Sequence, residues 1–224
     1  SGLLITATVS AGATVTNATA TTDGTGLATF AGLSLTGAAG NYTLDFTGSP
    51  YPVLTSSPIA LAAGTATQMV FITPPPASAV NGDILAPAVV VELRDASNNP
   101  VLVAGTNVTV TRIAGGGVLV GTTTVQTTSN GRATFADLAL QGSAPDTYQL
   151  RFASSGVPNL DSGNIALAVG SATQLLFQSA PPTSAVNGTT FGSNTVVALG
   201  DLTGNLVPTN NVSIVASVAS GPGA

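Results

Sequence analysis

The stretch that decides the fold reads Gly131-Arg-Ala-Thr-Phe-Ala-Asp-Leu-Ala-Leu-Gln141, and Tyr148-Gln-Leu-Arg-Phe152 follows it. A closely similar pattern occurs earlier as Gly26-Leu-Ala-Thr-Phe30 and Tyr42-Thr-Leu-Asp-Phe46. The copies are 105 residues apart at the first pair (131 − 26) and 106 at the second (148 − 42). Self-similarity at a fixed spacing is the signature of tandem structural units, so we expect copies of one unit.

The 106-residue spacing divides the chain into three parts. They are residues 1–63, the back half of one unit; residues 64–169, a complete unit; and residues 170–224, the front half of a further unit. The third copy is recognised by Ser184-Ala-Val-Asn-Gly188, which matches Ser78-Ala-Val-Asn-Gly82. The connection between the second and third parts is very short and is no flexible linker, so we predict a rod-like array with little hinging.

The composition indicates strands rather than helices. Small and β-branched residues dominate, with 26 glycines, 14 prolines and only 4% aromatic residues. Turn residues separate short segments in which apolar and polar residues alternate, which is typical of strands. The sequence therefore predicts an all-β fold with no helices of note and about seven strands in each complete unit.

One expected strand pair contains a change of side-chain parity. Ala133 and Phe135 occupy odd-numbered positions, whereas Leu138 and Leu140 occupy even-numbered positions. In one regular strand the two pairs of side chains would therefore point to opposite faces. Keeping all four side chains inside requires an extra residue, so we predict a bulge or corner near Ala136-Asp137.

Two more strands are expected in the half-units. Leu27–Leu35 repeats the pattern of the opening stretch, and Ile214–Val218 is the counterpart of Ile5–Val9. Taken alone, both half-units would expose unpaired strand edges, which favour association. Either a longer array or a neighbouring chain would complete them. The expected partners are therefore identical chains or neighbouring repeats.

Charge and hydropathy limit the other partners. Charged residues make up 6% of the chain, the net charge is −5, and the four arginines form no cluster. Phosphate binding needs clustered Lys and Arg, so no nucleic-acid partner is expected. No apolar run approaches the roughly 18 residues of a membrane-spanning helix, so we expect no membrane span in this segment. With so little charge, either Thr, Ser and Asn side chains keep the surface soluble, or neighbouring molecules or glycans cover it.

The repeated motifs resemble a known family of domains. The segments Ala-Thr-Gln-Leu-Leu-Phe177, Val-Glu-Leu-Arg-Asp95 and Tyr-Gln-Leu-Arg-Phe152 are similar to the bacterial Ig-like repeats found in tandem in very large surface-exposed and secreted proteins. The resemblance covers essentially the whole chain. It implies tandem seven-stranded β-sandwiches in which Tyr42 and Tyr148 stabilise a corner, and an extracellular or cell-surface location in a bacterium.

Candidate chemistry is sparse, and we expect no enzyme and no cofactor. The chain has no His and no Cys, which excludes His-dependent nucleophilic catalysis and cysteine–metal sites. Asp95, near Asn98 and Asn99, and Asp201, near Asn205, follow predicted strands. Their oxygen atoms fit either a calcium site or the local hydrogen bonds of an Asx turn, and one carboxylate per loop favours the turn.

Five asparagines fit the pattern for N-linked glycosylation. They are Asn17, Asn41, Asn107, Asn187 and Asn211. Chance matches are common in a chain rich in Asn and Thr, so glycans are a possible covering rather than a firm prediction.

The functional expectation is a structural, non-catalytic repeat segment of an extracellular fibre, sheath or cell-surface stalk. The alternative is an adhesin segment that binds carbohydrate or a host or cell-surface protein through its loops or a Thr-rich face. Tyr42, Tyr51 and Tyr148 are the only large planar residues besides Phe, so the sequence offers few platforms for sugar rings.

Overall fold

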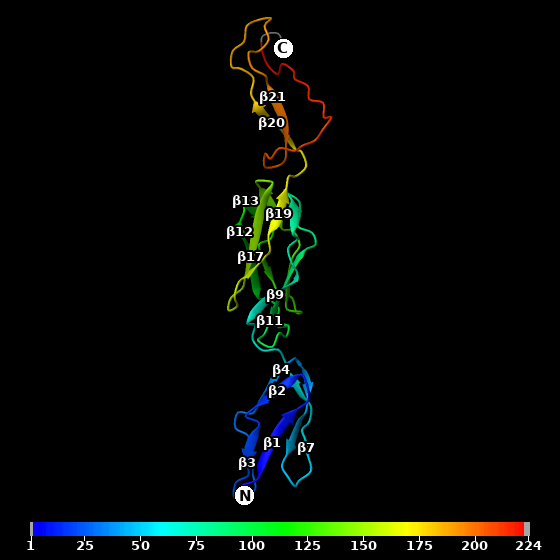
Figure 1. Cartoon of the computed structure of the whole chain (residues 1–224), viewed down its shortest axis with the longest axis vertical. Helices are drawn as coiled ribbons and strands as arrows, with labels where there is room; N and C mark the ends of the chain where they lie inside the picture. The colour runs from blue at the N-terminus through cyan, green and yellow to red at the C-terminus, as the bar shows by residue number, and fades with distance from the viewer. Residues whose placement is uncertain (1, 222–224) are drawn as a thin grey trace.

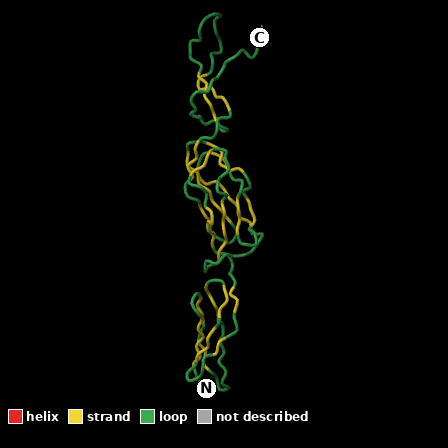
Figure 2. The backbone as a smooth tube through the Cα atoms, turned by 90° about the vertical axis from the view of Figure 1, so that its right-hand side faces the viewer, coloured by secondary structure: helices red, strands yellow, loops and turns green. Residues whose placement is uncertain are grey.

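The architecture is an all-β rod made of three successive groups of strands (Figure 1). The computed structural model describes residues 2–221, and the two ends of this range lie at opposite ends of the long axis. Strands and loops account for the backbone of the described residues, as Figure 2 shows from a second direction. In that range we find no helix that is long and apolar enough to span a membrane. The predicted all-β fold is thus confirmed.

The first group contains short antiparallel strands. They are β1 (Leu4–Val9), β2 (Ala13–Thr16), β3 (Thr19–Thr21), β4 (Ser34–Gly37), β5 (Gly40–Tyr42), β6 (Leu44–Thr47), β7 (Leu54–Thr55) and β8 (Ile59–Leu61). Four form a sheet in the order β3-β1-β6-β7, while β2 pairs with β4 and β5 pairs with β8. Thr and Val or Ala alternate along β1 to β3, which suits strands with one face toward the interior.

The middle group is larger. Its strands are β9 (Gln68–Thr73), β10 (Ser78–Val80), β11 (Val89–Arg94), β12 (Asn107–Ala114), β13 (Gly117–Val120), β14 (Thr124–Gln126), β15 (Arg132–Phe135), β16 (Ala139–Gly142), β17 (Asp146–Ala153), β18 (Leu160–Asp161) and β19 (Ile165–Ala168). One sheet has the order β10-β19-β17-β12-β14, with β18 beside β17, and another has the order β15-β11-β9. A further pair joins β13 to β16. The structure thus divides the predicted seven or so segments into eleven short strands.

The hydrophobic core lies between the sheets of the middle group. Phe152 touches two other rings edge-on, with centroid distances of 5.3 Å to both Phe71 and Phe135. Leu150 and Tyr148 extend from the same face of β17 and are fully buried. This arrangement follows from the period-2 alternation of β17, which directs every second side chain inward.

The predicted corner is present. Strand β15 ends at Phe135 in one sheet, and β16 begins at Ala139 in another, so the chain changes sheets between them. Ala133, Phe135, Leu138 and Leu140 are all buried, as the parity argument requires.

Both tyrosines expected to stabilise a corner bond to the backbone. The hydroxyl of Tyr148 lies 3.0 Å from the carbonyl oxygens of Gly116 and Ser143, to which it can donate. The hydroxyl of Tyr42 makes the equivalent contact with the carbonyl oxygen of Ala38 at 2.8 Å. These bonds satisfy the polar tip of an otherwise buried ring.

The third group consists of β20 (Gln174–Ser179) and β21 (Val196–Gly200), which pair with each other and lie near the C-terminal end of the rod. They are the counterparts of β9 and β11, 106 residues further on.

Two strand predictions are wrong. Of Leu27–Leu35, only the last two residues lie in a strand, and Ile214–Val218 lies in none. The physical reason is missing pairing. The counterpart of residues 27–30 is β15, which pairs with β11, and the first group has no counterpart of β11 in the described range. A segment with strand-like side chains forms no ladder without a neighbour to bond with.

Candidate functional site at the junctions between strand groups

The second junction, where the middle group meets the third, is centred on the buried carboxylate of Asp201. One of its oxygen atoms, Oδ1, accepts hydrogen bonds from the backbone N–H groups of Thr203 and Asn205, both at 3.0 Å. The other, Oδ2, accepts from the N–H of Gly170 at 3.0 Å and from the amide of Asn81 at 2.7 Å. Asp201 thus connects its own loop, the linker and the middle group.

Asn205 makes the second set of contacts across this junction. Its Oδ1 accepts from the N–H of Ala144 at 3.0 Å, and its Nδ2 donates to the carbonyl oxygen of Gly142 at 2.8 Å. The same Nδ2 lies 3.0 Å from Oδ2 of Asp201. The carboxylate therefore orients the amide that holds the neighbouring group.

The first junction, where the first group meets the middle group, repeats this arrangement. Asp95 accepts from the N–H of Gly64 at 2.8 Å and from Nδ2 of Asn99 at 3.0 Å. Asn99 in turn accepts from the N–H of Ala39 at 2.7 Å and donates to the carbonyl oxygen of Gly37 at 2.9 Å. Each of these residues has its counterpart in the second junction 105 or 106 positions later.

The hydrogen bonds lower the pKa of both carboxylates. The side-chain amide of Asn99 and the N–H of Gly64 lower the pKa of Asp95 from 3.8 to about 2. Burial raises the pKa of Asp201, but donors from Asn205, Gly170 and Asn81 outweigh it, so that this pKa also lies below its ordinary value. Both groups are therefore ionised at neutral pH, which strengthens their hydrogen bonds.

This gives a pH prediction for the first junction. A carboxyl group whose pKa is lower in the folded form stabilises that form above the unfolded pKa and loses this contribution as the pH falls through the folded pKa. The Asp95 contacts are therefore expected to weaken as the pH falls from about 4 to about 2. Small-angle X-ray scattering should show a shorter, more variable maximum dimension in this window, while far-UV circular dichroism still shows strands.

The variant Asp95→Asn is the matched control for this titration. It cannot ionise at position 95, so the acid-induced change at the first junction should be absent from it. If wild type and variant respond to acid in the same way, the effect comes from other carboxyl groups.

Both acidic loops contain the hydrogen bond of an Asx turn. The backbone N–H of Ser97 donates to Asp95 Oδ1 at 2.9 Å, two residues along the chain, and Thr203 does the same to Asp201. Donors rather than acceptors surround both carboxylates, whereas Ca²⁺ requires several oxygen ligands. Within residues 2–221 the structure groups no three His, Cys, Asp or Glu side chains in a way that could hold a metal ion.

The five glycosylation candidates all have exposed side chains, but the structure brings no two of them to a common site. Asn17 is in the left-handed backbone region and donates from Nδ2 to the carbonyl oxygen of Gly32 at 2.9 Å. Asn41 and Asn107 lie in strands, and Asn187 and Asn211 lie outside strands.

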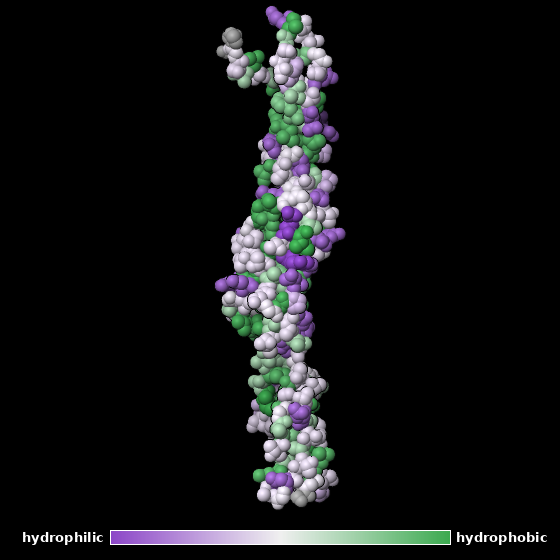
Figure 3. All heavy atoms as spheres, turned by 90° about the vertical axis from the view of Figure 1, so that its left-hand side faces the viewer, coloured by the Kyte–Doolittle hydropathy of each residue, from purple (hydrophilic) through white to green (hydrophobic). Residues whose placement is uncertain are grey.

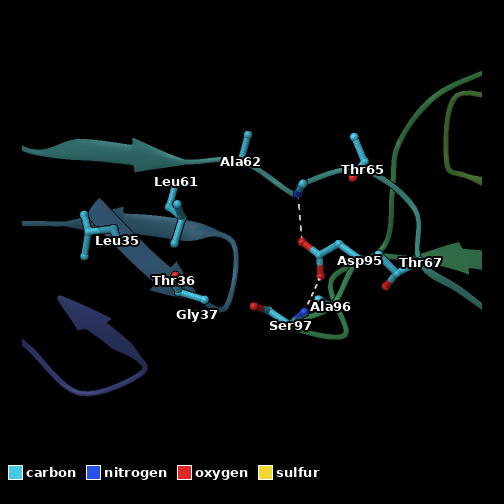
Figure 4. A pocket seen from close by; sticks show the side chains of 11 residues that line it. Leu35, Thr36, Gly37, Leu61, Ala62, Thr65, Thr67, Asp95, Ala96 and Ser97 are labelled. Atoms are coloured by element: carbon cyan, nitrogen blue, oxygen red, sulfur yellow. Dashed lines mark hydrogen bonds between the residues drawn. The ribbon is translucent and has the colours of Figure 1, made fainter. Parts of the chain in front are cut away.

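A pocket of about 290 Å³ lies beside the Asp95 carboxylate at the first junction (Figure 4). Leu35 and Gly37 of the first group line one side, Leu61 and Ala62 another, and the Asp95 loop closes the opposite end.

Sequence reasoning found the acidic loops but missed the residues they hold. No motif in the sequence identifies Gly37, Gly142 or Asn81 as junction residues, because their role depends on contact with another group of strands. The available signal was internal: Asn81 recurs as Asn187 inside an identical five-residue segment.

Comparison with known proteins gives distant structural likenesses only. No family model matches the chain. No curated protein matches it in sequence. Similar solved structures include a β-glycosidase from Bacteroides vulgatus, with 10% identity, a TM-score of 0.39, and coverage of 73% of this chain and 21% of that one. A β-glucuronidase from Parabacteroides merdae has 16% identity, a TM-score of 0.33 and coverage of 73% and 21%.

Another similar structure is that of the surface layer protein SbsC, domains 4–9. It has 15% identity and a TM-score of 0.35, and the match covers 99% of this chain and 40% of that one. The chain thus spans from about a fifth to two fifths of the length of these proteins. These likenesses are too distant to carry a functional argument.

Proposed function

We propose that this chain is a structural, non-catalytic segment of an extracellular fibre, sheath or cell-surface stalk in a bacterium. It consists of tandem Ig-like β-sandwich units divided at 1–63, 64–169 and 170–224. The observation that carries the proposal is the repetition of one polar junction, in which the carboxylate accepts from the linker glycine and from the loop asparagine, at Asp95 and at Asp201.

Such a junction suits a spacer that must hold its length. A flexible linker leaves neighbouring domains free to reorient, whereas each junction here fixes the linker glycine and one strand end of the preceding group. The units add along one axis (Figure 1). The longest strands of the middle group, β12 and β17, hold 8 residues each and span about 26 Å at roughly 3.3 Å per residue. Length would then grow in proportion to the number of repeats.

The exposed apolar side chains support a role in assembly. Apolar side chains are exposed along the rod and near both of its ends (Figure 3), including Leu27, Leu54, Leu175 and Phe177. Contiguous exposed apolar surface marks places where proteins associate. Self-association with identical chains or neighbouring repeats is therefore part of the proposal.

Small-angle X-ray scattering of the dilute full chain tests the rod. We expect a single maximum dimension and a constant cross-section that fit one extended particle. Scattering that requires a broad distribution of bent and straight forms at neutral pH would contradict a length-holding role.

A further inference from the structure

Arg112 differs from the other arginines of the chain in having no acidic partner. Each of the other three forms an ion pair, and the pairs are Arg94 and Arg132 with Glu92, and Arg151 with Asp161. Within residues 2–221 the structure gives Arg112 no ion pair. Its Nη1 donates to the carbonyl oxygen of Gly115. A guanidinium group carries five N–H donors in a planar fork, so most of the donors of Arg112 are available to a ligand.

Arg112 lies where the two sheets of the middle group separate. Strand β12 pairs with β14 from Asn107 to Thr109, and the N–H of Val110 then donates to the carbonyl oxygen of Thr123 at 2.8 Å. After Arg112 the chain turns into β13, which pairs with β16 in another sheet. In the described part of the chain, the edge of β12 around Arg112 therefore has no strand paired with it on this side.

An open groove of about 360 Å³ lies at this edge. Beside Arg112, its lining includes the hydroxyl-bearing residues Thr111 and Thr123 and the apolar residues Val118 and Leu119. Arg112 is half-buried, whereas Val118 is 56% exposed. The groove thus combines one positive charge, two hydroxyl groups and apolar surface, and its volume falls in the range of small-molecule sites.

The fold does not require an arginine at this position. Arg112 lies opposite Leu150 of β17, and Val9 of β1 lies opposite Leu44 of β6. Leu44 and Leu150 are counterparts, 106 positions apart (150 − 44). The first group therefore has the apolar Val9 where the middle group has Arg112. Partial burial of a charge costs free energy that an apolar residue does not cost, so the arginine needs a reason outside the sandwich itself.

The contact with Gly115 does not supply that reason. The turn after β12 is one residue longer than the turn after β1: Gly116, whose carbonyl oxygen lies 3.0 Å from a tyrosine hydroxyl, comes four residues after Arg112, and its counterpart Gly12 comes three after Val9. The bond to Gly115 stabilises the longer turn. It uses a neutral acceptor, however, and leaves the charge of Arg112 without an opposite charge.

The geometry points to this groove as a binding site for a carboxylate group, held by Arg112. The chain contains an example of the contact: Nε and Nη2 of Arg151 each lie 2.7 Å from a carboxylate oxygen of Asp161. One guanidinium matches one carboxylate in charge and in planar geometry. A phosphate monoester carries close to two negative charges and fits a single arginine less well, in a chain whose net charge is −5.

The remaining lining suits a small molecule with the carboxylate at one end. Val118 and Leu119 provide apolar contacts, and the hydroxyl groups of Thr111 and Thr123 can donate to or accept from polar substituents. Short aliphatic acids and sugar acids both have this form, and the carboxylate is what they share. The site adds a ligand-binding role to the segment, and the proposed structural function does not depend on it.

Nuclear magnetic resonance titration of the isotope-labelled full chain tests the site with two probes, sodium butyrate and sodium glucuronate. At low ionic strength we expect the amide resonances of Val118, Leu119 and Thr123 to shift with a Kd of about 1 mM, because one ion pair binds a small ligand weakly. Butanol and glucose, which lack the carboxylate, should leave these resonances unchanged. Shifts with both acids show that the carboxylate suffices, and shifts with one acid alone identify the preferred body of the ligand.

The matched variant is Arg112→Val, which introduces the residue found at this place in the first group. It should keep the fold and weaken binding about tenfold or more, because it removes charge-assisted hydrogen bonds. Arg112→Lys keeps the charge but loses the planar fork, so its affinity should be intermediate, and it tests the site even if Arg112→Val is unstable. The control Arg151→Gln removes a positive charge that already holds Asp161 and should bind like wild type.

Three results would overturn the inference. The first is an equal response of wild type, Arg112→Val and Arg112→Lys, and the second is an equal loss of affinity in Arg151→Gln and Arg112→Val, which would mean that only overall charge matters. The third is the absence of shifts with tens of millimolar of either acid, or tighter binding of inorganic phosphate than of both acids. The scattering expected of a rod is independent of all these results.

Discussion

Replacing Phe152 by alanine is expected to lower the free energy of unfolding of the middle group by about 4 kcal/mol. The side chain is fully buried and touches Phe71 and Phe135 edge-on, each at a centroid distance of 5.3 Å. Truncation removes this apolar burial and leaves a cavity between sheets that short strands hold in place. With so few aromatic residues in the chain, no other large ring is available to fill it.

Hydrogen–deuterium exchange of peptides from β17 measures this loss separately from the other groups, which unfold independently of the middle one if each has its own core. The control is Leu102→Ala, which truncates an apolar side chain that is 65% exposed and should change stability by no more than about 0.5 kcal/mol. Equal effects of the two substitutions would mean that the ring cluster is not the centre of the core.

A buried charge cluster lies at the edge of the same core. Glu92 accepts from Arg94 and Arg132, each at 2.8 Å. Burial raises the pKa of Glu92, but the two arginines outweigh it and hold the pKa below its ordinary value. Glu92 lies on the face of β11 opposite Val91 and Leu93, and the two partly exposed arginines cover its carboxylate, which explains how a buried charge is tolerated there.

The fold was predictable from sequence where the signal was local or repeated. The parity change around Ala136-Asp137 predicted the corner, because side-chain alternation is a property of each strand by itself. The spacing of 105 to 106 residues correctly identified the counterparts of β9 and β11 in the third group and of Asp95 and Asn99 in its loop. Strand β10 was missed because it is three residues long and follows three consecutive prolines, so no alternation can be read from it.

The sequence pattern did not predict which strands pair or which residues of neighbouring strand groups make contact. Residues 27–30 carry the pattern of β15 but form no strand in the described structure, since a ladder depends on a neighbour that the pattern does not specify. The partners of Asn205 lie 61 and 63 positions away, across a linker. Identity between copies shows which residues are equivalent, while only the structure shows that they meet.

The substitution Asp201→Asn is expected to destabilise the second junction by about 3 kcal/mol, because hydrogen bonds to a charged group contribute about 1.5 to 3 kcal/mol each. The carboxylate accepts from donors on both oxygens, including the N–H groups of Gly170 and Thr203. An amide can present one oxygen only, so in either orientation its NH₂ group faces donors that have lost their acceptor. Asn205 loses the contact that orients it toward Gly142, and the rod should bend at this junction.

Scattering should therefore show a shorter and more variable particle for Asp201→Asn, and the amide of Gly170 should exchange faster. The matched control is Asp83→Asn, which makes the same change of charge at an exposed residue of the middle group. The first junction serves as an internal reference, since Asp95 keeps its own donors and Gly64 should exchange as in wild type. If the rod stays straight in Asp201→Asn, its stiffness comes from the shortness of the linker alone, and the repeated carboxylates are not what sets the geometry of the array.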